Sequence, residues 1–157
     1  PSYYSRLDDY INNLKKKYVR CIGYEMIHLK EKESSLDLIK TVLSQRNYWY
    51  RNRWYNKTLL SSKPLEWQIG FHKVSQLLPS YDKKLLLIHL HKFDYDYCWN
   101  KSFERSKLKW NDEDIKEGRG WQNRMTDKEE FDKYYFNWPK RFKIVEIPEE
   151  IKKTDLF

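Results

Sequence analysis

Two histidines separated by one residue, His89 and His91, have the clearest spacing for chemistry in this sequence. They lie in the apolar run LLLIHLHKF, which is bounded by a turn-like segment and by two aspartates and therefore predicts a β-strand. Residues i and i+2 of a strand point to the same face, so both imidazoles could bind one divalent metal ion. The alternative is a half-buried strand whose histidines are hydrogen-bonded to tyrosines or carboxylates.

This His-hydrophobe-His pattern, followed later by a tyrosine, resembles the HUH single-strand endonucleases of replication initiators and some transposases. The resemblance implies metal-assisted attack of a tyrosine on a DNA phosphate. It makes His89 and His91 the metal ligands and Tyr134 or Tyr135 the nucleophile. It covers one tripeptide and a tyrosine, and the Tyr-x-x-Lys pattern of that family is absent at 134–138.

Other chemistry would need side chains that are far apart in the sequence. A ribonuclease without a metal ion would need an acid and a base for proton transfer and an arginine for the phosphate. Its acid and base would come from Glu66, His72, His89 and His91. The carboxylates of Asp94 and Asp96 could bind Mg²⁺ or simply face solvent. Glycine-rich phosphate loops and nucleophile elbows are absent, so no cofactor is predicted and a nucleotide-binding enzyme is disfavoured.

Rings and guanidinium groups alternate in the stretch RNYWYRNRWYNK at 46–57, and a second basic aromatic stretch, WPKRFK, begins at Trp138. Flat rings beside cations can stack on nucleobases while the charges meet phosphates. The leading hypothesis is therefore a non-enzymatic protein that binds nucleic acid, with single strands or RNA favoured over a specific duplex sequence. The predicted contacts are Arg46, Tyr48, Arg51, Arg53, Tyr55, Lys57, Lys140 and Arg141.

Two other hypotheses use the same residues differently. Aromatic residues at helical spacing are typical of packed cores, and a buried arginine would then need an internal partner. Because Trp, Tyr and Arg also dominate protein interfaces, the chain could instead be an accessory subunit of a large assembly, such as a mitochondrial complex or a ribonucleoprotein.

One long helix over 35–60 is expected to carry the central stretch, with an apolar face and an opposite aromatic and basic face. Further helices are predicted after Ser5, over 65–78 between two prolines, at 102–110 and over 127–137 behind the capping box that begins at Thr126. Strands are expected at 85–93 and 142–147. The predicted fold is a single α+β domain over 1–157. It is mainly α-helical, with about four helices and a small two- or three-stranded sheet.

Composition limits the partners and the compartment. The formal net charge of +8 favours an anionic partner such as nucleic acid, although 23 acidic residues are spread along the chain. The two cysteines are far apart, which suits a reducing compartment: cytoplasm, nucleus or mitochondrial matrix rather than a secreted protein. No apolar run is long enough for a membrane span. The absence of alanine and the many Lys, Asn, Ile and Tyr residues are typical of an AT-rich genome, for example a viral one.

Overall fold

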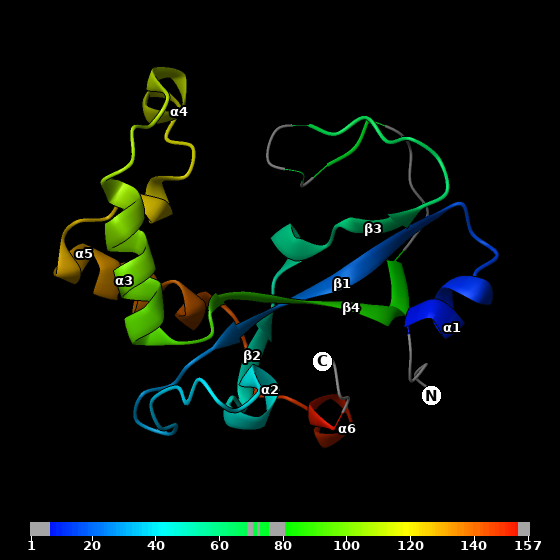
Figure 1. Ribbon diagram of the computed structural model, residues 1–157, viewed down its shortest axis with the longest axis horizontal. Coiled ribbons are helices and arrows are strands. Elements are labelled where there is room, and N and C mark those ends of the chain that lie inside the picture. The colour runs from blue at the N-terminus through cyan, green and yellow to red at the C-terminus, as the bar shows by residue number, and fades with distance from the viewer. Residues whose placement is uncertain (1–6, 69–70, 72, 76–80, 154–157) are drawn as a thin grey trace. The chain divides into compact units, whose positions relative to one another are not determined.

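The computed structural model describes residues 7–68, 71, 73–75 and 81–153, and its described strands form one antiparallel sheet (Figure 1). The strands are β1 (Tyr18–Ile27), β2 (Tyr48–Arg51), β3 (Thr58–Ser61), β4 (Tyr81–Lys92) and β5 (Ile144–Glu146). Their order is β3-β1-β2-β5, and β4 pairs with β1. The predicted mainly helical fold with a two- or three-stranded sheet is therefore wrong, because five strands pair and the helices between them are short.

The longest described helix, α3 (Tyr95–Ser106), has 12 residues. The other α-helices are α1 (Leu7–Asn12), α2 (Val42–Gln45), α4 (Asp112–Lys116), α5 (Lys128–Asp132) and α6 (Glu149–Lys152). Short 3₁₀ segments of the described chain include η1 (Arg53–Tyr55), η3 (Trp121–Asn123) and η5 (Pro139–Arg141), and η4 (Lys133–Asn137) is a π-helical turn. Most of these helices are too short to persist without tertiary packing.

The chain folds into two compact units. Unit 1 comprises 1–25, 51–89 and 147–157, and unit 2 comprises 26–50 and 90–146. Strands β1, β2 and β4 each contribute residues to both units. The expected single domain stays a prediction.

The predicted helix over 35–60 is wrong. Only Val42–Gln45 is α-helical there, and the chain then continues as β2, η1 and β3. In β2 the large rings of Trp49 and Tyr50 are buried, which an extended, half-buried strand accommodates well. The side chain of Asn52 accepts a hydrogen bond from the Trp54 backbone N–H at 3.1 Å and starts η1 instead of continuing a helix. Leu38 and Ile39, assigned to the helix, are almost fully exposed on a loop.

The other predicted elements have mixed outcomes. The strand at 85–93 is confirmed by β4, and the helix at 127–137 by α5 and η4, although the cap is Asp127 rather than Thr126. The strand at 142–147 is confirmed as the shorter β5, which pairs with β2 and not with β4. The N-terminal helix after Ser5 ends at Asn12, and α3 begins seven residues before the helix expected at 102–110. Helix 65–78 is wrong in its described part, where Trp67 and Val74 form an antiparallel bridge; the rest lies outside the described residues.

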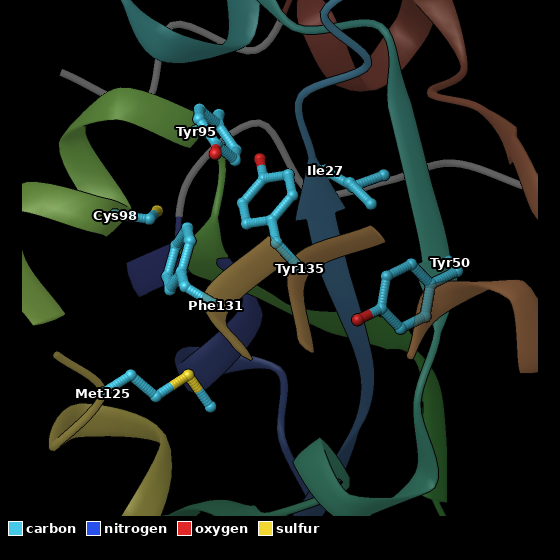
Figure 2. Packing of buried hydrophobic residues seen from close by; sticks show 7 residues of the cluster. All are labelled: Ile27, Tyr50, Tyr95, Cys98, Met125, Phe131 and Tyr135. Atoms are coloured by element: carbon cyan, nitrogen blue, oxygen red, sulfur yellow. The ribbon is translucent and has the colours of Figure 1, made fainter. Parts of the chain in front are cut away.

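Aromatic side chains fill the core of unit 2 (Figure 2). Tyr135 lies with its ring centroid 5.0 Å from that of Tyr95 and 5.7 Å from that of Phe131. The rings of Tyr95 and Tyr135 meet edge to face, a contact that stabilises by more than its buried area alone. The buried cluster consists of Ile27, Tyr50, Tyr95, Cys98, Met125, Phe131 and Tyr135. Rings therefore fill most of this core in a chain that has no alanine, and they fix the helical segment that follows Asp127.

Candidate nucleic-acid interface

The chain from α5 to η5 is helical, and side chains three or four positions apart in it share a face. Its side chains can therefore be sorted into one buried face and two that border solvent. Phe131, Tyr135 and Pro139 are buried and fix the segment to the core of unit 2. The remaining two faces of 133–141, which we call the ridge, each border a surface hollow.

The ridge is tied to β4 by a buried lysine. The ammonium group of Lys92, a residue only 1% exposed, donates to the carbonyl oxygens of Tyr134 at 2.9 Å and Tyr135 at 3.4 Å. It also lies 3.5 Å from the centroid of the Tyr134 ring. These bonds engage backbone carbonyls of the π-helical turn η4, a rare structure that recurs at functional sites.

The first hollow, which we call the tryptophan hollow, has a volume of about 260 Å³. Three rings and two cations line it together with an amide and a carboxylate. The guanidinium carbon of Arg141 lies 4.7 Å from the Trp138 ring centroid, and the rings of Trp121 and Tyr134 meet edge to face at 5.4 Å. Its lining residues are Trp121, Glu130, Lys133, Tyr134, Asn137, Trp138 and Arg141.

The second hollow, which we call the tyrosine hollow, has a volume of about 370 Å³ and shares no lining residue with the first. The ammonium group of Lys32 lies 5.1 Å from the Tyr48 ring centroid, and Lys140 is exposed. Two cations and one carboxylate line each hollow, so both are net positive at neutral pH. The lining residues are Ile27, Leu29, Glu31, Lys32, Tyr48, Phe136, Pro139, Lys140 and Ile144.

Three of the predicted nucleic-acid contacts therefore line this surface of unit 2: Tyr48, Lys140 and Arg141. Sequence reasoning missed most of their companions, above all Glu130 and Lys133. The available signal was the spacing of residues 130, 133, 134, 137, 138 and 141, which falls on one helical face once the helix is continued through Pro139. The shared face was overlooked because the predicted helix ended before Pro139.

Arg46 lies inside unit 2 and has no exposed surface. Its guanidinium group donates to Asp94 Oδ2 at 2.7 Å and to the carbonyl oxygens of Ser34 and Gln45, both at 3.1 Å. The other carboxylate oxygen of Asp94 accepts the Tyr97 N–H at 2.8 Å and caps α3. The pair thus joins the loop before β2 to the start of α3, and this predicted phosphate contact is an internal one.

The remaining predicted contacts belong to unit 1. Arg51 and Arg53 are exposed, and Tyr55 and Lys57 are half-buried. A Cβ atom at Gly23 would lie 2.4 Å from the carbonyl carbon and the Cβ of Tyr55, so only glycine permits the close passage of η1 over β1. The predicted aromatic and basic face of a single helix is wrong. These side chains project from β2, from η1 and from the loop that follows η1.

The two histidines belong to different units, and each has its own neighbours. His89 Nδ1 lies 2.8 Å from Oε2 of the fully buried Glu25, and its ring stacks on Tyr55 with centroids 4.0 Å apart. His91 lies edge-on to the Tyr134 ring at 6.0 Å. Within the described ranges, no three His, Cys, Asp or Glu side chains lie together as a metal site would require.

The two tyrosines proposed as nucleophiles differ in access. Tyr135 has no exposed surface and donates its hydroxyl proton to the carbonyl oxygen of Lys92 at 2.6 Å. Burial raises the pKa of its hydroxyl far above the usual value, the opposite of what an attacking phenolate needs. Tyr134 is half-buried and borders the tryptophan hollow.

Comparison with protein-family models, with curated proteins and with solved structures gives no match. Among the helices of the described chain, none combines the length and apolar character needed to cross a bilayer.

Proposed function

We propose that this protein binds single-stranded nucleic acid through the ridge of unit 2 and its two flanking hollows. The observation that supports the proposal is that rings and cations line the same two hollows. Stacking of a base on an aromatic side chain contributes about 1–3 kcal/mol, and lysine and arginine meet the phosphates between stacked bases. Base faces reach rings in a hollow only when the bases are unpaired and splayed, which favours a single strand over a duplex.

Fluorescence anisotropy with labelled single strands of RNA and DNA, and with the matching duplex, tests this proposal. Four cations line the hollows: Lys32, Lys133, Lys140 and Arg141. If each neutralises one phosphate, the logarithm of the association constant should fall with the logarithm of the salt concentration with a slope of about −3. A duplex that binds as tightly as the strand, or affinity that does not change with salt, would contradict the proposal.

Two variants separate stacking from charge. Trp138→Ala should weaken binding by about 1–3 kcal/mol at every salt concentration, because one ring is lost. Lys140→Ala, at an exposed residue, should make the salt slope shallower by about 0.7. Lys109→Ala is the matched control, because Lys109 is exposed but lines neither hollow. If Lys140→Ala and Lys109→Ala change the salt slope equally, the ridge is not part of the interface.

A second candidate function, attachment to a protein partner in a larger assembly, is favoured by a loop of unit 2. Leu38 and Ile39 are 87% and 95% exposed, although the loop is braced by the side chain of Gln45, which hydrogen-bonds the N–H and C=O of Asp37 and the C=O of Lys40. A braced loop that exposes two adjacent apolar side chains is typical of a protein contact. If the partner is a second copy of this chain, Leu38→Ser/Ile39→Ser should reduce self-association in sedimentation without changing strand binding; unchanged sedimentation would argue against that partner.

A further inference from the structure

The tryptophan hollow contains a carboxylate that general phosphate binding does not explain. Glu130 lines the hollow together with Lys133 and Arg141 and repels phosphate. Lys133 is instead paired with the neighbouring Glu129, whose carboxylate lies 2.7 Å from its ammonium group. Among the described residues, the Glu130 carboxylate makes no hydrogen bond or ion pair. Glu130 is exposed in the first turn of α5, so its carboxylate is free to exchange water for a donor from a ligand that enters this net positive, ring-lined hollow.

We infer that the tryptophan hollow accepts a guanine base from the single strand and that Glu130 selects it; this inference rests on the proposed function. Guanine presents two adjacent donors, N1–H and the N2 amino group, which match the two oxygens of one carboxylate. Adenine and cytosine place an acceptor beside their amino group, and uracil places its single N–H between two acceptors. A carboxylate therefore forms a bidentate pair with guanine alone among the four bases.

The other lining groups complement the rest of that nucleotide. Asn137 Oδ1 accepts a hydrogen bond from the Lys140 ammonium at 2.9 Å, which leaves the Asn137 amide N–H groups as donors for guanine O6. The three rings offer stacking surface, and Arg141 and Lys133 supply charge for the phosphate. At about 260 Å³ the hollow is smaller than the ~300–1,000 Å³ of a pocket for a drug-sized ligand, so it suits one base.

The test uses oligouridylate strands that carry one central guanosine, adenosine or inosine, with binding to the full chain measured by anisotropy. The guanosine strand should bind roughly tenfold more tightly than the adenosine strand, as expected for one bidentate pair. Inosine lacks the N2 amino group and should lose most of that advantage. Glu130→Gln should reduce the guanosine-to-adenosine ratio towards one, because an amide offers only one acceptor oxygen.

Glu129→Gln is the matched control, because Glu129 is the neighbouring glutamate and does not line the hollow. It should change the affinity for all strands alike and leave the guanosine-to-adenosine ratio unchanged. Equal binding of all strands, or a guanosine preference that survives Glu130→Gln, would overturn the guanine assignment while leaving general strand binding in place. Failure of every strand to bind would instead overturn the proposed function.

Discussion

Arg46→Ala should strongly destabilise the protein, although Arg46 looks like a surface cation in the sequence. The substitution removes a fully buried guanidinium group and leaves the Asp94 carboxylate, 4% exposed, without its ion-pair partner. His28 Nδ1 lies 3.5 Å from the same carboxylate, but this nitrogen is already engaged by the Tyr95 N–H at 3.3 Å.

The size of the effect follows from the burial of both partners. Breaking a buried ion pair from one side costs about 3–5 kcal/mol, because the remaining charge is uncompensated. A domain is typically stable by about 5–15 kcal/mol, so Arg46→Ala removes a large share of that total. Asp94→Asn keeps the oxygen that caps α3, whereas Asp94→Ala also loses the cap and should be worse by about 1 kcal/mol.

Urea denaturation followed by tryptophan fluorescence and circular dichroism measures these losses. The loss for Arg46→Ala should be nearly the same in low and high salt, because a buried pair is poorly screened. Lys107→Ala is the control: its ion pair with Glu104 spans 2.7 Å but is largely exposed, and removing it should leave the unfolding midpoint unchanged. If Arg46→Ala behaves like Lys107→Ala, Arg46 is not an internal residue and remains available to a nucleic acid.

Three further outcomes are expected. Gly23→Ala should destabilise by about 1–3 kcal/mol in urea unfolding, because the added Cβ meets the backbone of Tyr55; an unchanged midpoint would mean that η1 does not cross β1 closely. Tyr135→Phe should cost about 0.5–1.5 kcal/mol in the same assay through loss of its hydrogen bond to Lys92, and an equally stable variant would contradict that bond. Burial raises the pKa of the Tyr95 and Tyr135 hydroxyls, and the hydrogen bond to Asp132 adds to the effect at Tyr95. The contribution of these tyrosines to stability should therefore be constant below the unfolded tyrosine pKa of about 10 and fall as pH rises above it. Unfolding measured across that alkaline range should show a smaller fall for Tyr135→Phe, and an identical fall would exclude Tyr135 as a cause.

The sequence predicts elements well where a single pattern dominates. All of the apolar run at 85–93 except its last residue lies in β4, and Asp127 begins the last long helical segment, because both signals are local. The helix predicted for 46–57 is wrong because consecutive aromatic residues satisfy helical and strand spacing alike. Its outcome is decided by distant partners: Tyr48 pairs with Glu146, and the Asn52 N–H donates to the Gly23 carbonyl oxygen. The asparagines at 52 and 56 were the local sign of a break.

The site was predictable to a smaller extent than the fold. Lys140 and Arg141 were proposed as contacts because rings and cations adjoin in the sequence, and both line the hollows. Arg46 was misjudged because its partner Asp94 is 48 residues away and no spacing rule connects them. Glu130 was not selected from the sequence, because its place in the tryptophan hollow follows only from the helical register that continues into the ridge.

The route of the backbone has a practical consequence for dissecting this protein. Its path passes between the two units four times, after residues 25, 50, 89 and 146, and three of those passages occur in the middle of strands. No single proteolytic cut can release either unit, and neither can be expressed as one continuous fragment. Separate study of the half that bears the ridge would require a rewired gene in which 26–50 and 90–146 are joined by a designed linker.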